Sequence, residues 1–218
     1  FVGELDKNTI TGFLNKTFGT WDSKMKFTAI APKHFDVKGG TEAINTPDKT
    51  NAVVLGNINI NISETHKDYP ALFMANELLG GGAFLSSRIP MRLRENEGMS
   101  YGAGTYMNSN YKYDVTNWGL YAIFNPLYKG RLDSAMHQEI DKAIAAGFTK
   151  DELTKSVSAW IEGNKTSLGM NDFLARQLRW YIRDGRDLTD QRLTCLVRVL
   201  VQLFGLPQHL RAAQLGGP

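Results

Sequence analysis

Arg94 and Tyr101 are the two residues of this 218-residue sequence whose side chains best suit the recognition of a bound ligand. A guanidinium offers forked N–H donors and a phenol offers one O–H donor, so the pair could hold backbone carbonyls or a carboxylate of a peptide. On residue type alone, the two would more often be an exposed ion-pair residue and a packed strand tyrosine. Their assignment therefore depends on the elements that carry them.

The elements around this pair are predicted to be a short helix followed by a strand. Pro90 suits the first helical position, because it has no N–H to leave unpaired and its φ is already helical. Gly98 suits the left-handed residue just past the helix end. Gly102 and Gly104 then fall at strand spacing, where glycines often mark the close approach of a backbone or a ligand. The pair is thus expected where a helix meets a sheet.

The rest of the sequence predicts more strands and helices. The clearest strand is 51–62, in which apolar residues alternate with Asn57, Asn59 and Asn61, so that one face packs on helices and the other meets water or a partner. Thr149 and Glu152 form a capping box that opens a late helix. Strands are expected at 1–5, 51–62, 101–107 and 113–124, and helices at 8–18, 68–78, 90–97, around 132–144, from 149 and at 171–181 with Asn171 as cap. The expected fold class is α+β, a two-layer sandwich with a mostly antiparallel sheet and helices packed on one face.

Composition excludes several functional classes. With 25 basic and 22 acidic residues the net charge is +3, which is too balanced to favour nucleic acid. No apolar run approaches the roughly 20 residues that span a bilayer. A single cysteine, Cys195, rules out an internal disulfide. The chain begins with Phe1 and no initiator methionine, so we expect it to be a piece of a longer protein.

The last residues differ from the rest. No lysine follows Lys165 and no acidic residue follows Asp190, while Leu, Val, Gln and Arg dominate. Residues 1–188 are expected to form one α+β domain and 189–218 an atypical tail. The tail is either a buried apolar helix over 193–204 or non-native sequence from a shifted frame or truncation, which would be poorly ordered.

The sequence lacks a complete hydrolytic centre. A zinc site needs at least three convergent ligands, and a helix supplies two of them at i, i+4 spacing. The inverted motif His-x-x-Glu-His and the Gly-x-Ser-x-Gly elbow are both absent. Glu95 and Glu97 are expected to lie on a solvated helix face. The four isolated histidines are His34, His66, His137 and His209. No metal site is therefore assigned to this chain.

Several motifs, taken together, resemble the C-terminal, non-zinc half of the inverted zinc metallopeptidases, the insulinase, pitrilysin and mitochondrial processing-peptidase superfamily. They follow in the family's order and extend to about residue 185. They are Phe1 to Asp6, Phe18-Gly19, Leu79-Gly80-Gly81-Gly82, Ser86-Ser87-Arg88, Leu93-Arg94-Glu95, Gly98-x-Ser100-Tyr101-Gly102 and Gly147-Phe148-Thr149-x-x-Glu152-Leu153.

This resemblance implies a division of labour between two halves. Arg94 and Tyr101 would bind substrate and support the transition state in the active site of a zinc-bearing partner half. Zinc would belong to that partner, carried on the same parent chain or on a separate subunit, and this chain would hold no cofactor and not be active alone. The substrate would be a peptide, and polar strand faces and a sheet edge would receive it. A homodimer in isolation is left open, and the periplasm or cytoplasm of a bacterium is the expected location.

Two alternatives remain beside this interpretation. The chain could be a non-catalytic structural core subunit or assembly domain of the same superfamily, although the intact Arg94 and Tyr101 favour the peptidase role. It could also be an unrelated α+β module that binds a small molecule near Gly80 to Gly82. No Gly-Lys-Ser or Gly-Lys-Thr follows those glycines, which argues against a nucleotide.

Overall fold

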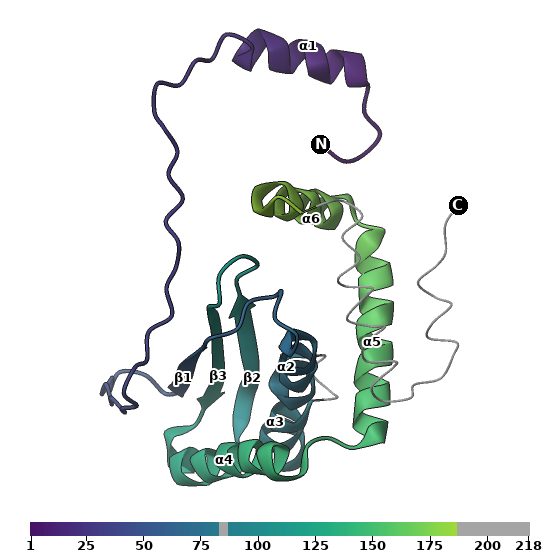
Figure 1. Cartoon of the computed structure of the whole chain (residues 1–218). Coiled ribbons are helices and arrows are strands. Elements are labelled where there is room, and N and C mark those ends of the chain that lie inside the picture. Colours follow the sequence, from purple (N-terminus) through teal and green to yellow (C-terminus); the bar gives the residue numbers. More distant parts are fainter. Residues whose placement is uncertain (83–86, 187–218) are drawn as a thin grey trace. The chain divides into compact units, whose positions relative to one another are not determined.

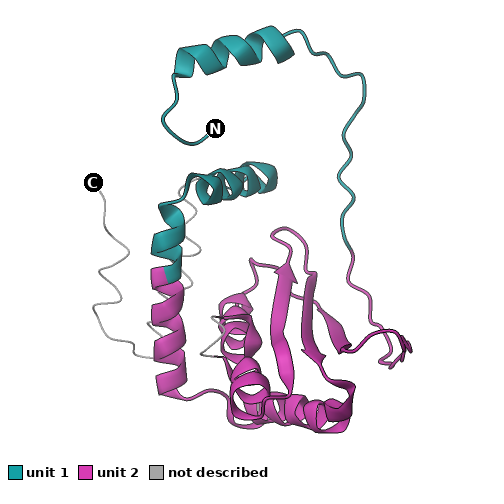
Figure 2. Ribbon diagram, turned by 180° about the vertical axis from the view of Figure 1, so that it is seen from behind, with its two compact units in different colours: residues 1–32, 163–190 teal, residues 33–162, 191–218 magenta. Residues whose placement is uncertain are grey.

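The computed structural model describes residues 1–82 and 87–186 of the chain (Figure 1). The described residues form two compact units, one of 1–32 with 163–186 and one of 33–162 without 83–86 (Figure 2). The expected tail, 189–218, lies outside the described residues, and the single domain over 1–188 stays a prediction. None of the described helices is long and apolar enough to cross a membrane.

The larger unit is built on an antiparallel sheet. Its strands are β1 (Ala52–Ile60), β2 (Ser100–Ser109) and β3 (Thr116–Phe124), in the order β1-β3-β2. Ala122 of β3 lies opposite Val54 on one side and Ala103 on the other, and all three side chains belong to the core side of the sheet. The predicted alternation in β1 is confirmed in part: Val54 is partly buried and Asn57 and Asn59 are exposed, but Ile58, on the face predicted to pack on helices, is 55% exposed.

Helices pack on one face of this sheet (Figure 1). They are α2 (Tyr69–Asn76), the π-helix η1 (Glu77–Gly81), α3 (Arg88–Pro90), the π-helix η2 (Met91–Asn96) and α4 (Lys129–Ala146), which the short η3 (Pro126–Tyr128) precedes. A further helix, α5 (Lys150–Leu168), packs on α2, and its last residues belong to the smaller unit. One buried cluster joins η2, α4 and the sheet through Leu93, Ala122 and Leu132. A second cluster joins α2 to α5 through Met74 and Val157. The α+β two-layer arrangement predicted from the sequence is confirmed.

Local signals near the helix ends gave mixed results. The capping box is confirmed, because the Thr149 N–H donates to Glu152 Oε2 at 2.7 Å and the Glu152 N–H donates to Thr149 Oγ1 at 3.2 Å. Gly98 has φ +62°, as its place after the helix predicted. The position of Pro90 was predicted wrongly: the helix begins at Arg88, and Pro90 is its third residue. The first turn tolerates this, since its N–H groups have no intrahelical acceptor.

The smaller unit holds α1 (Lys7–Phe18) and α6 (Asn171–Asp184). Asp6 caps α1 by accepting from the N–H groups of Asn8 and Thr9 at 3.2 and 3.0 Å. The strand predicted over 1–5 is wrong, because a strand requires a neighbouring backbone and these residues pair with none of the described strands. Asn171 begins α6 as predicted but does not cap it, since the cap residue is Met170.

Candidate functional site

The junction between η2 and β2 is closed by a short backbone turn anchored at both ends. Leu93 and Met99 are only 1% and 2% exposed, so each side chain fixes one end of the turn in the core. The Met99 N–H donates to the Leu93 carbonyl at 2.8 Å, and the Gly98 N–H donates to the Arg94 carbonyl at 3.2 Å. Arg94 and Tyr101 therefore lie on the two sides of one closed turn, as the sequence predicted.

Tyr101 is the extra residue of a β-bulge. Ser100 lies opposite Phe124 and Gly102 lies opposite Ile123, which leaves Tyr101 without a partner across the sheet. Ser100 Oγ holds the bulge, lying 2.8 Å from the Ile123 carbonyl and accepting from the Gly102 N–H at 3.2 Å. The Tyr101 side chain is 72% exposed. Without the bulge, the phenol would follow the regular pleat of the strand. The bulge thus directs it away from the sheet and into solvent.

The sequence analysis missed this bulge, although a signal for it was present. A glycine inside a strand marks either a bulge or a close approach, and Gly102 was interpreted as the second. A Cβ placed on Gly102 would have nothing within 4 Å, so there is no close approach. At Gly104 the expectation holds, because a Cβ there would lie 2.8 Å from the Gly80 carbonyl oxygen.

The glycine turn that ends η1 is filled by the chain itself. A Cβ on Gly80 would lie 2.7 Å from the Thr105 backbone nitrogen, and one on Gly81 would lie 2.1 Å from Asn76 Nδ2. The glycines therefore allow η1 to pack directly on β2 and on its own turn. This packing supports a structural role for the turn and weighs against the small-molecule alternative.

Arg94 is also accessible to solvent. Its side chain is 48% exposed, and its Nε lies 3.6 Å from Oε1 of the adjacent Glu95, beyond ordinary hydrogen-bond distance. An exposed pair of this kind contributes little and can exchange for a ligand carboxylate or carbonyl at small cost. The structure thus places both predicted site residues at one junction with their polar ends accessible.

A second arginine in the same region is firmly held. Arg88 donates from Nε and Nη2 to the two carboxylate oxygens of Glu152 at 2.7 and 2.9 Å, and from Nη2 to the Gly147 carbonyl at 3.0 Å. Its guanidinium lies 4.5 Å from the centre of the Phe148 ring. The hydrogen bonds from Arg88 are the largest cause that lowers the pKa of Glu152 to about 2. Arg88 thus joins the start of α3 to the start of α5.

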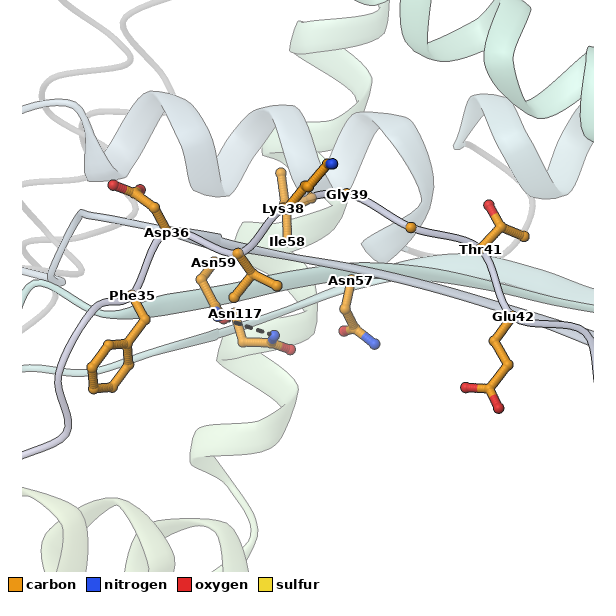
Figure 3. A pocket seen from close by; sticks show the side chains of 12 residues that line it. Phe35, Asp36, Lys38, Gly39, Thr41, Glu42, Asn57, Ile58, Asn59 and Asn117 are labelled. Atoms are coloured by element: carbon orange, nitrogen blue, oxygen red, sulfur yellow. Dashed lines mark hydrogen bonds between the residues drawn. The ribbon is translucent and has the colours of Figure 1, made fainter.

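The sheet face opposite the helices, which we call the uncovered face because none of the described helices packs on it, offers further polar groups. Asn117 Nδ2 donates to Asn59 Oδ1 at 3.3 Å, and the Tyr106 hydroxyl donates to Asn57 Oδ1. Figure 3 shows these asparagines beside the segment 35–42, where they line a cavity of about 760 Å³. Exposed carboxamides can hydrogen-bond with an extended peptide, because each carries both donors and an acceptor.

Metal ligands do not converge in residues 1–82 and 87–186: no group of three His, Cys, Asp or Glu side chains there could hold an ion. His137, for example, is 69% exposed and lies 2.9 Å from the carbonyl of Asp133 on its own helix. The described residues therefore do not fit a zinc centre, and no chemical step is assigned to a metal on this chain.

One of the comparisons with known proteins identifies a family. A family model described as the peptidase M16 inactive domain matches residues 1–159. No curated protein matches the sequence. Among solved structures, a protease from Helicobacter pylori has 18% identity and a TM-score of 0.69, covering 98% of this chain and 50% of that one.

Two further structures are similar. The peptidase M16 inactive domain from Pseudomonas fluorescens has 19% identity and a TM-score of 0.56, covering 76% of this chain and 38% of that one. A periplasmic protease from Escherichia coli has 14% identity and a TM-score of 0.64, covering 97% and 22%. All three come from bacteria, and this chain spans half or less of each. The structures support the fold, the resemblance noted in the sequence is confirmed, and the chain belongs to the peptidase M16 family through its inactive domain.

Proposed function

We propose that this domain is the substrate-binding half of a zinc metallopeptidase and acts with a zinc-bearing half on the same parent chain or on a separate subunit. Arg94 binds the peptide, and Tyr101 donates a hydrogen bond to the oxyanion that develops on the scissile carbonyl. Zinc on the partner half would polarise that carbonyl and its attacking water. Neither half would cleave peptides alone.

The observation that carries this proposal is the exposure of both side chains at one anchored turn. A hydrogen-bond donor aids catalysis when it is fixed before the charge develops, since it then costs no reorganisation during the reaction. Tyr101 meets part of this condition, because its backbone is held at the Ser100 bulge, and its ring is 72% exposed and so within reach of a peptide that could complete the alignment. A subunit with a purely structural role has no use for a bulge that directs a phenol into solvent.

The carboxamides of the uncovered sheet face support the same function. Asn57 and Asn59 of β1 are exposed, and Asn117 lies beside them on β3. The main chain of an extended peptide presents alternating N–H and C=O groups, which such side chains can satisfy. The peptide would then contact the sheet face while its scissile bond lies at the η2–β2 turn.

The test is cleavage of a quenched fluorescent peptide by this chain alone, by the zinc-bearing half alone, and by the two mixed. We expect turnover only in the mixture and its loss on addition of a chelator. The control variant is Tyr113→Phe, which removes a phenol at the opposite end of the β2–β3 hairpin and should leave turnover unchanged. Silence of the mixture, with association of the halves confirmed, would favour the structural core subunit instead.

A further inference from the structure

Arg92 lies at the centre of a hydrogen-bonded network between η2 and α4. Its Nε donates to Glu97 Oε1 at 2.8 Å, its Nη2 donates to Gln138 Oε1 at 2.6 Å, and its Nη1 donates to Glu139 Oε1 at 3.0 Å. Nη1 also lies 3.3 Å from the Ala135 carbonyl. We call Arg92, Glu97, Gln138 and Glu139 the Arg92 clamp.

The clamp holds both ends of η2. Arg92 is near the first residue of this helix, and Glu97 directly precedes Gly98 at its end. Glu97 is held twice, because Arg131 of α4 also lies 3.4 Å from its second carboxylate oxygen. Arg92 first, and Arg131 to a smaller extent, lower the pKa of Glu97, so the carboxylate stays charged in neutral solution.

The residues that the clamp holds are next to the proposed site residues. Arg94 follows Arg92 by two positions, and Tyr101 follows Glu97 by four. The buried Leu93 and Met99 fix the depth of the turn in the core, and the Arg92 hydrogen bonds add a polar connection from η2 to α4. A π-helix is also rare and often lies at functional sites, and its wide turn gains from outside support. Polar contacts to α4 supply that support on the side opposite to exposed Arg94.

We propose that Arg92 is a positioning residue that fixes the orientation of η2 and of the Gly98 turn, and thereby the placement of Arg94 and Tyr101 relative to each other. The inference rests on the proposed function and adds to it a residue that does not touch the peptide. Four of the five N–H donors of Arg92 are taken by acceptors on α4 and at the end of η2, which favours a structural role over direct contact with a substrate.

The test compares Arg92→Met and Arg92→Lys in the mixture with the zinc-bearing half. Methionine keeps the apolar stem and removes the donors, whereas lysine keeps the charge but not the fork. We expect Arg92→Met to lower kcat about ten- to a hundredfold, the scale of a small misplacement of a catalytic group, and to raise KM by less than the roughly tenfold expected for complete loss of the Arg94 side chain. Arg92→Lys should recover part of the loss.

Two readouts separate positioning from mere stabilisation. Amide hydrogen exchange over 97–102 should accelerate in Arg92→Met at a temperature where the rest of the domain remains protected. In the double variant with Tyr101→Phe, turnover should fall no further than in Tyr101→Phe alone, because a misplaced donor and an absent donor are equivalent. Multiplicative losses would overturn the inference, since they indicate that Arg92 acts independently of Tyr101.

The outcomes also distinguish this inference from the proposed function. If Tyr101→Phe lowers turnover while Arg92→Met leaves kcat unchanged, the proposed function stands and the positioning role is wrong. If Tyr101→Phe itself has no effect, both are overturned. If Arg92→Met fails to fold, Glu139→Gln removes one acceptor of the clamp more gently and should show a smaller loss of kcat with the same exchange pattern.

Discussion

The two sides of η2 carry the same chemical group in different surroundings. On the side that faces α4, Arg92 is 26% exposed and donates to several acceptors. On the other side, Arg94 is 48% exposed and has its neighbour Glu95 at 3.6 Å. A guanidinium with four of its five donors used mainly holds a structure, whereas one that is half exposed can be reached by a ligand. The comparison teaches that surroundings, more than residue type, separate a structural arginine from a binding one.

The largest expected effect is on the exposed side, where Tyr101→Phe should reduce turnover of the reconstituted enzyme about ten- to a thousandfold, the scale of losing one oxyanion donor. The ring and its backbone bulge remain, so the free energy of unfolding should not change. Steady-state kinetics with Tyr113→Phe as the matched control measure the effect. Equal turnover of the two variants would remove Tyr101 from the mechanism.

The firmly held arginines, to which Arg88 of α3 also belongs, should instead govern the free energy of unfolding. Arg88→Met leaves the Glu152 carboxylate without its forked partner and should lower the free energy of unfolding by about 2 kcal/mol. Arg94→Met, on the exposed side, should lower it by less than about 0.5 kcal/mol. Urea unfolding followed by tryptophan fluorescence gives both values. Similar losses of stability in the two variants would abolish the distinction between a firmly held and an exposed arginine.

The Arg88–Glu152 contact also predicts a pH dependence. The folded pKa of Glu152, about 2, lies below its ordinary value of 4.5, so its contribution to stability is present above pH 4.5 and is lost as the pH falls toward 2. The carboxylate side chain is 30% exposed, so screening reduces this contribution to about 1 to 2 kcal/mol. Unfolding measured at pH 6, 4 and 3 should show a smaller decrease in Glu152→Gln than in the unchanged chain.

Arg94→Ala should have a much smaller effect on turnover than Tyr101→Phe and should change binding more than chemistry. Loss of one charged hydrogen bond to a peptide is worth about 1.5 kcal/mol, or roughly tenfold in affinity. We expect KM to rise by that factor with kcat little changed. Arg176→Ala in α6 is the matched control, because Arg176 is 58% exposed and paired with Asp172. An unchanged KM in Arg94→Ala would refute the binding role.

Sequence reasoning succeeded for some of the local rules. The capping box at Thr149 and the left-handed Gly98 depend on neighbours in the chain and are confirmed, whereas Pro90 as the first helical residue and Asn171 as a cap are wrong. The family resemblance added the Arg94 and Tyr101 pair, whose exposed positions the structure reports. Their roles in binding and catalysis stay a prediction.

The rest depends on contacts between distant parts of the chain. Glu97 was expected on a solvated face beside Glu95, but it accepts from Arg92 and lies near Arg131 of α4, which no local pattern announces. The strand expected over 1–5 failed for a related reason, since a strand exists only through a partner. The role of Arg88 was missed because Glu152 lies 64 positions away.

The most direct test of the central claim is whether Tyr101 touches the peptide. A photo-crosslinking phenylalanine derivative would replace Tyr101 in the full chain, and the same derivative at Tyr113 would serve as control. In the presence of the zinc-bearing half and an uncleaved peptide, we expect a stronger crosslink to the scissile region of the peptide from position 101 than from 113. Equal crosslinking from both positions, or none from position 101 while the halves are associated, would contradict the account.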